Sequence, residues 1–115
     1  MNIKNAKITS TQLGREDHGI MTFMIFVEFD IGCCGIGGYA LDYYDRASKT
    51  RVYSPKSMEI ISKILDVVGV DSWEQLPGKY IRFTYDGGGS VINEIGNITK
   101  DKWLNIRDFF AKNES

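Results

Sequence analysis

The residue pattern best suited to binding a ligand lies in two predicted strands near the C-terminal end of the chain. These strands cover residues 79–85 and 90–98, and a glycine-rich turn joins them. A turn centred on Gly88 places Arg82 opposite Glu94, which is a favourable cross-strand charge pair. The same register places Phe83 opposite Asn93 on the other face. An aromatic plane beside an amide suits a purine, because the ring stacks on the base while the amide hydrogen-bonds to its edge. The alternative is that Asn93 bonds to backbone or water at a strand edge.

A second candidate is the glycine-rich segment Gly35-Ile-Gly37-Gly38-Tyr-Ala40, which matches the G-x-G-x-x-A spacing of dinucleotide-binding loops. That fingerprint requires a helix directly afterwards and a parallel crossover. Here the next residues, LDYYDRASKTR, read as strand and turn. We therefore expect the three glycines to allow a close backbone approach instead, as in a bulge, a subunit contact or an amide-lined anion site.

Catalytic chemistry has few candidate residues. The only histidine, His18, lies in a predicted loop and cannot build a multi-histidine metal site. It is a candidate base for a thiol nucleophile at Cys33 or Cys34, but no recognised nucleophile signature surrounds these cysteines. The two cysteines are adjacent, so we expect reduced thiols in a cytosolic protein rather than a disulfide. The sequence predicts no enzyme, no metal site and no cofactor.

Composition limits the partners. The chain has 115 residues, of which 43% are hydrophobic and 25% charged, with a formal net charge of −1. This predicts a single globular domain over residues 1–115. Balanced charge argues against DNA and membrane surfaces as partners, since both attract basic proteins. It still allows a small anionic ligand. The longest apolar run, residues 20–29, is too short to span a membrane.

The predicted elements are three strand regions, a helix, two strands and a helix. The first strands cover residues 3–13 and 20–29, and the second of them is apolar on both alternating faces. We therefore expect it to be central and covered twice, once by a helix and once by a second subunit. The clearest helix covers residues 55–68, with Ser54 as its cap and Gly69 at its end.

We predict that Thr99 caps the short C-terminal helix, which buries Trp103, Ile106 and Phe110. The fold class is thus α+β, with an about five-stranded, mostly antiparallel sheet packed by one main helix.

Two longer stretches of the sequence resemble a known family. The opening, IKNAKITSTQLGREDHGIMTF, leads through the glycine segment to GGYALDYYD, and later VVGVDSWEQLPGKYIR precedes a strand, a turn and IGNITKDKW. Together these resemble the phage Thoeris anti-defence proteins of the first type, over about residues 3 to 104. The family implies no reaction. Its members are sponges that bind cyclic ADP-ribose isomers made by bacterial TIR-domain proteins. Some also capture cyclic trinucleotides at a separate site.

The resemblance implies a role for each candidate residue. Phe83 stacks on the adenine, Asn93 hydrogen-bonds to the ligand, and Arg107 binds the pyrophosphate through its guanidinium fork. Amides around Gly35, Gly37 and Gly38 would form a second anion site at an oligomer interface.

The resemblance also implies a homo-oligomer, a dimer or larger, with sites between its subunits. The protein would act in the cytoplasm of the infected bacterial host. Two rival functions remain open: an enzyme that degrades the cyclic nucleotide, and an inhibitor that binds the TIR protein itself.

Overall fold

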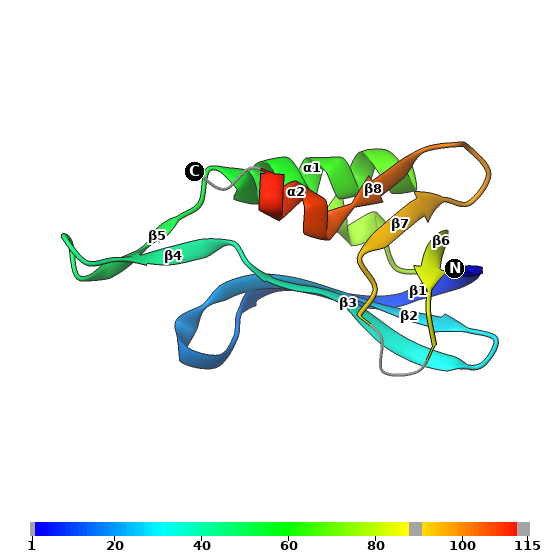
Figure 1. Ribbon diagram of the computed structural model, residues 1–115, viewed down its shortest axis with the longest axis horizontal. Helices are drawn as coiled ribbons and strands as arrows, with labels where there is room; N and C mark the ends of the chain where they lie inside the picture. The colour runs from blue at the N-terminus through cyan, green and yellow to red at the C-terminus, as the bar shows by residue number, and fades with distance from the viewer. Residues whose placement is uncertain (1, 88–90, 113–115) are drawn as a thin grey trace.

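The computed structural model describes residues 2–87 and 91–112. Over these residues the chain forms eight strands, two α-helices and two short 3-10 helices (Figure 1). The strands are β1 (Asn2–Arg15), β2 (Met21–Phe29), β3 (Gly32–Ala40), β4 (Asp42–Asp45), β5 (Thr50–Tyr53), β6 (Tyr80–Tyr85), β7 (Glu94–Asn97) and β8 (Trp103–Asn105). The helices are α1 (Lys56–Val68) and α2 (Ile106–Lys112), and the 3-10 helices are Asp17–Gly19 and Trp73–Gln75.

Six strands form one antiparallel sheet in the order β3-β2-β1-β6-β7-β8. Strands β4 and β5 form a separate two-stranded ribbon that projects from the body (Figure 1). Both helices lie on the same side of β1, β2 and β3. The predicted α+β class is confirmed, with one main helix and a short C-terminal helix. The main sheet has six strands rather than about five.

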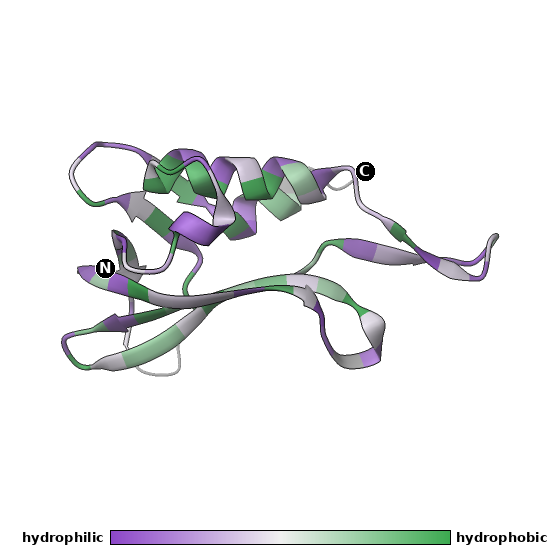
Figure 2. Ribbon diagram, turned by 180° about the vertical axis from the view of Figure 1, so that it is seen from behind, coloured by the Kyte–Doolittle hydropathy of each residue, from purple (hydrophilic) through white to green (hydrophobic). Residues whose placement is uncertain are grey.

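The hydrophobic core lies between the helices and one face of the sheet. From α1, Ile60 and Ile64 are fully buried, and from β2, Phe23, Ile25 and Val27 are fully buried. Hydrophobic and hydrophilic bands alternate along α1, as expected of an amphipathic helix (Figure 2). Each such apolar side chain contributes about 1.5–3 kcal/mol when it leaves water.

Helix α1 begins and ends on the signals that its sequence contains. The Ser54 Oγ accepts the backbone N–H of Lys56 at 3.2 Å and so satisfies one free donor of the first turn. Gly69 has a φ of 92°, and its N–H donates to the carbonyl oxygen of Leu65. Only glycine adopts this left-handed conformation without strain, so the helix ends there. Neither helix of the described residues has the length and apolar character to cross a membrane.

Strand β2 has a neighbour on both sides, β1 and β3, as predicted of an interior strand, although it lies next to the edge strand β3 rather than in the middle of the sheet. One of its faces forms the core. On the other face, Met24 is half-buried and the Phe26 side chain is 36% exposed, with no helix of the described chain over them. The second cover expected from another subunit stays a prediction.

The predicted register of the β6–β7 hairpin is wrong. Phe83 pairs with Ile95 rather than with Asn93, and Arg82 pairs with Gly96, which replaces its predicted charge pair. Asn93 precedes β7 and lies outside the paired residues. The predicted turn includes residues 88–90, which lie outside the described residues.

Trp103 gives the physical reason for this register. Its indole ring covers Gly96, where a Cβ atom would lie only 2.6 Å from the ring. The guanidinium carbon of Arg82 lies 4.8 Å from the ring centroid, and the Arg82 Nε donates to the Asn97 carbonyl oxygen at 2.6 Å. A glycine opposite Arg82 thus leaves room for an indole and a guanidinium to stack on the sheet.

The C-terminal helix starts later than predicted. Trp103 belongs to strand β8, and α2 begins at Ile106. The cap is Asn105 rather than Thr99, because the Asn105 Oδ1 accepts the backbone N–H of Asp108 at 2.9 Å. The predicted burial of Ile106 is confirmed, whereas Phe110 is half-buried.

The β4–β5 ribbon is fixed to the body at its base. The Asp42 carboxylate accepts from the Arg51 guanidinium at 2.7 Å and from the Met21 N–H at 3.2 Å. Only 6% of the Asp42 side chain is exposed, and burial by itself would raise the pKa of its carboxyl, but the hydrogen bonds to Arg51 and Met21 outweigh that effect. The bond to Arg51 holds the pKa of Asp42 below its ordinary value.

Candidate functional site

A β-bulge in strand β3 positions the first residue of the site. Thr22 pairs with Ala40 and Met24 pairs with Gly37, so β3 has one residue more than β2 between these two pairs. A bulge of this kind turns the following side chain away from regular strand alternation. The residue affected here is Tyr39, and its carbonyl oxygen accepts the Thr22 hydroxyl at 2.7 Å.

The Tyr39 side chain contacts two segments from the C-terminal part of the chain. Its ring stacks on Phe110 of α2, with 4.7 Å between the ring centroids and 14° between the planes. Its hydroxyl lies 3.5 Å from the Asn93 Oδ1, which is at the long end of hydrogen-bond distances. The backbone of Asn93 is fixed separately, because its carbonyl oxygen accepts the Ile106 N–H at 2.7 Å. Strand β3, the residue before β7 and helix α2 therefore meet at Tyr39.

Arg107 adds a positive charge to this group. Burial raises the pKa of the Tyr39 hydroxyl, and the nearby Arg107 charge opposes that rise by favouring the phenolate. Arg107 itself is exposed, so its guanidinium remains accessible to an anion. We call Tyr39, Asn93, Arg107 and Phe110 the tyrosine cluster. It combines two stacked rings, an amide and a guanidinium, a combination suited to a planar ligand with a negative charge.

Phe83 does not belong to this cluster. Its side chain is 0% exposed, and its ring meets Phe29 edge-on at 5.2 Å and Tyr85 edge-on at 5.9 Å. A ring packed in the core presents no face to a ligand, so the prediction that Phe83 stacks on adenine has no support in this arrangement. Of the other two predicted ligand residues, Asn93 meets the Tyr39 hydroxyl, and Arg107 follows Ile106, whose N–H donates to the Asn93 carbonyl oxygen.

Sequence reasoning missed two members of the cluster. Tyr39 lies in the glycine-rich segment for which a bulge is one of the expected explanations. The Gly37-Gly38-Tyr39 order is the sequence signal that indicates this bulge. Phe110 was predicted only as a buried residue of the C-terminal helix.

The glycines of β3 have a packing explanation. A Cβ atom on Gly37 would lie 2.6 Å from the Phe23 carbonyl oxygen, and Gly37 has a φ of 123°. A Cβ atom on Gly35 would lie 2.5 Å from the Met24 methyl group, and Gly38 has a φ of 85° within the bulge. Three explanations were expected for these glycines, and one of them, the bulge, is thus confirmed. An anion site at these residues remains a prediction.

His18 and the two cysteines, the residues considered for an alternative catalytic function, lie far apart. His18 is at the tip of the β1–β2 hairpin, beyond Met21, whereas Cys34 pairs with Val27 near the other end of β2. Met21 and Val27 are six residues apart along β2, which corresponds to about 20 Å. Burial also raises the pKa of the Cys34 thiol, which disfavours the reactive thiolate. The geometry does not pair His18 with a cysteine.

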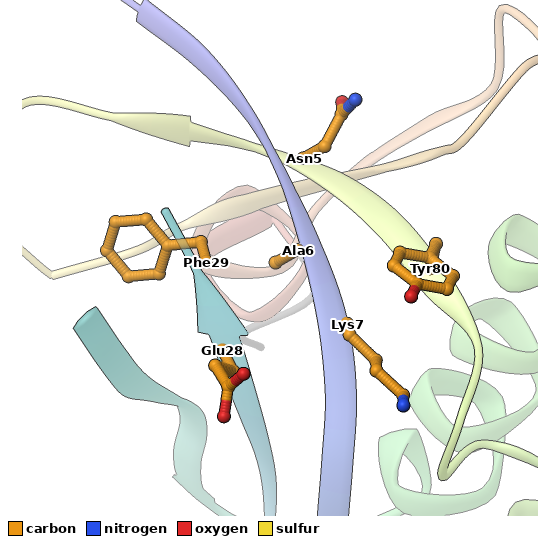
Figure 3. Close-up of a pocket in the computed structure, with 6 residues that line it drawn as sticks. All are labelled: Asn5, Ala6, Lys7, Glu28, Phe29 and Tyr80. Atoms are coloured by element: carbon orange, nitrogen blue, oxygen red, sulfur yellow. The ribbon is translucent and has the colours of Figure 1, made fainter. Parts of the chain in front are cut away.

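One hollow among the described residues does not include the predicted ligand residues Phe83, Asn93 and Arg107. A shallow hollow of about 230 Å³ lies across β2, β1 and β6 (Figure 3). Its lining comprises Asn5, Ala6, Lys7, Glu28, Phe29 and Tyr80. Over residues 2–87 and 91–112, no three histidine, cysteine or acidic side chains are grouped as a metal site requires.

The described residues form an α+β fold in which the tyrosine cluster joins strand β3, the residue before β7 and helix α2. Comparisons with known protein families, with characterised proteins and with solved structures find no match. A functional proposal therefore rests on the chemistry of the tyrosine cluster and on the sequence resemblance.

Proposed function

We propose that this protein binds and sequesters a cyclic ADP-ribose isomer made by bacterial TIR-domain proteins, without cleaving it. It acts as a phage anti-defence sponge in the cytoplasm of the infected bacterium. The observation that carries the proposal is the tyrosine cluster, in which the Tyr39 ring stacks on Phe110, its hydroxyl meets Asn93, and the Arg107 charge lies nearby.

The chemistry of the cluster matches this ligand class. A cyclic ADP-ribose isomer contains an adenine, two riboses and a pyrophosphate. The aromatic rings suit the base, the amide suits the base edge or a ribose hydroxyl, and the guanidinium suits the phosphate oxygens. A single arginine is enough for such a ligand, so the balanced net charge of the chain is compatible with the proposal.

The proposal includes a homo-oligomer with its site between subunits. The outer face of β2, where Met24 and Phe26 form an apolar surface that no described helix covers, supports the association of subunits. The placement of the site between subunits rests on the sequence resemblance. We do not extend the proposal to cyclic trinucleotides, because packing against β2 and the bulge already explain Gly35, Gly37 and Gly38.

Mass spectrometry of bound nucleotides tests the proposal. Protein purified from cells with active TIR signalling should release an intact cyclic ADP-ribose isomer on heating. Arg107→Gln should release much less, while the control Arg46→Gln, at an exposed position on the β4–β5 turn, should match the wild type.

The same experiment separates the rival functions. Recovery of linear ADP-ribose would indicate an enzyme and overturn the sponge proposal. Absence of any nucleotide, together with nucleotide-free co-purification of the TIR protein, would indicate a direct inhibitor instead.

A further inference from the structure

We propose that Lys56 is a positioning residue, which holds the C-terminal end of α2 and thereby fixes Arg107 relative to Tyr39. This inference rests on the proposed function and concerns the support of its phosphate-binding arginine, not a contact with the ligand. The observation that carries it is a hydrogen bond between the two helices, in which the Lys56 Nζ donates to the Phe110 carbonyl oxygen at 3.4 Å.

Helix α2 needs support from the rest of the fold because it is short. It has seven residues, about two turns, and a helix of this length is not stable alone in water. Its N-terminal end is held by the fully buried Ile106, whose N–H donates to the Asn93 carbonyl oxygen at 2.7 Å, and by the Asn105 cap. The last four carbonyl groups of a helix have no partner within it, so the C-terminal end requires an external donor.

Lys56 supplies such a donor from a fixed position. It is the first residue of α1, and its backbone N–H donates to the Ser54 Oγ. Lys56 is half-buried, and helix α2 lies against α1 (Figure 1). A cation is favoured beside the C-terminal carbonyls of a helix, because these groups carry partial negative charge. The main helix thus holds the end of the short one.

The position of this end matters for Arg107. Arg107 and Phe110 are three residues apart, so they lie on one face of α2. The Phe110 ring stacks on Tyr39 with 4.7 Å between the centroids, and the Arg107 charge acts on the Tyr39 hydroxyl. Movement of the last turn therefore changes the place of both residues relative to Tyr39. The bond from Lys56 opposes that movement.

Isothermal titration calorimetry with a TIR-made cyclic ADP-ribose isomer tests the effect on binding. Lys56→Met retains an unbranched apolar side chain but removes the donor, and should weaken binding by about 2- to 12-fold, the equivalent of one net hydrogen bond. Lys56→Arg retains a donor and should keep most of the affinity. The control Lys63→Met lies on the same helix, at a side chain that is 45% exposed, and should match the wild type.

A double-mutant cycle on the pKa of Tyr39, followed by NMR without ligand, separates positioning from a general loss of stability. Arg107→Gln changes the pKa of Tyr39 because it removes the charge that favours the phenolate. If Lys56 holds Arg107 in place, this change should be smaller in the Lys56→Met background than with Lys56 present. A change in the burial of Tyr39 affects both members of each pair and cancels. Thermal unfolding confirms that each variant folds.

The outcomes distinguish this inference from the proposed function. If the isomer binds equally well to the wild type and to Lys56→Met, the positioning role is wrong and the sponge function stands. If Lys56→Met weakens binding but leaves the effect of Arg107→Gln on Tyr39 unchanged, Lys56 acts on the ligand directly and the positioning role is also wrong. If no isomer binds to the wild type, the sponge function is wrong, and the cycle on Tyr39 alone decides the role of Lys56.

Discussion

The side-chain amide of Asn97 donates a hydrogen bond to the Val67 carbonyl oxygen, 3.0 Å away, and so joins the C-terminal end of α1 to strand β7. The Asn97 Oδ1 accepts from the backbone N–H groups of Thr99 and Lys100, at 3.0 and 2.8 Å. The buried Asn97 side chain thus hydrogen-bonds to a backbone carbonyl at the end of α1 and to two backbone N–H groups in the turn that leads to Trp103. This turn determines where β8 starts, and β8 leads directly into the helix that contains Arg107 and Phe110.

Replacement of Asn97 should be strongly destabilising. Asn97→Ala leaves two backbone N–H groups and a helix carbonyl without their partner, so we expect a loss of about 2–4 kcal/mol in the free energy of unfolding. Urea denaturation measures it. The control is Asn105→Ala, which removes a single capping bond and should lose about 1 kcal/mol. Equal losses in the two variants would contradict the linking role of Asn97.

Gly96 and Trp103 should be energetically coupled. Gly96→Ala places a methyl group where the indole lies 2.6 Å away, so the ring must move, and we expect a loss of about 1–3 kcal/mol. In Trp103→Leu the smaller side chain makes room for the methyl group. The double variant should therefore lose less stability than the sum of the two single variants, as a double-mutant cycle by urea denaturation would show. Strict additivity would indicate that the indole does not determine the need for glycine.

The two glycines of the bulge should differ in their tolerance of alanine. Gly37→Ala combines a φ of 123° with a contact to the Phe23 carbonyl oxygen, and backbone cannot yield easily. Gly38→Ala has a φ of 85° but only a 3.6 Å contact with the Met24 sulfur. We expect about 1–2 kcal/mol for Gly38→Ala, the ordinary cost of left-handed backbone, and clearly more for Gly37→Ala. Thermal unfolding measures both, and the reverse order would contradict the assigned bulge.

The Tyr39 hydroxyl should report on Arg107 without any ligand. Burial raises its pKa and the Arg107 charge lowers it, so Arg107→Gln should raise the pKa of Tyr39 further. Titration followed by NMR of the tyrosine ring measures the shift. Lys79→Gln, a control on the loop before β6, should leave the Tyr39 titration unchanged. An identical Tyr39 titration in wild type and Arg107→Gln would place the guanidinium away from the cluster.

Acid should loosen the base of the β4–β5 ribbon through Asp42. The pKa of Asp42 is lower in the folded than in the unfolded protein, so its contribution to stability is complete above the unfolded value of about 3.9. The contribution disappears as the pH falls through the lower, folded value. Asp42→Asn should therefore be less stable than the wild type at pH 7, and the difference should shrink below about pH 4. Asp30→Asn, at an exposed ion pair with Lys4, is the matched control. A difference that persists at low pH would contradict this role of Asp42.

Local signals predicted the elements that depend on neighbouring residues. Helix α1 followed from apolar spacing, the Ser54 cap and Gly69, all of which act within one or two turns. The β6–β7 register and the start of α2 were predicted wrongly, because both depend on contacts between residues that are far apart in the sequence. The β6–β7 register depends on Trp103 lying over Gly96, and the start of α2 depends on the turn that Asn97 holds.

The candidate site was only half predictable for the same reason. Asn93 and Arg107 were identified as residue types suited to a nucleotide. The expected partner Phe83 was assigned from a hairpin register that the structure does not have. Tyr39 reaches Asn93 because a bulge turns its side chain toward a distant part of the chain. The Gly-Gly-Tyr order indicates a bulge but does not indicate which distant residues Tyr39 meets.

The glycine bulge also affects how copies of the protein can meet. Strand β3 is one border of the main sheet, and the other border, β8, has only three residues. An edge strand with a bulge and an edge strand of three residues both pair poorly with a strand of another molecule. Neither edge therefore favours extension of the sheet across molecules. The faces of the sheet are therefore the surfaces better suited to the homo-oligomer that we propose. The bulge that positions Tyr39 thereby also makes β3 a poor edge for the addition of a further strand.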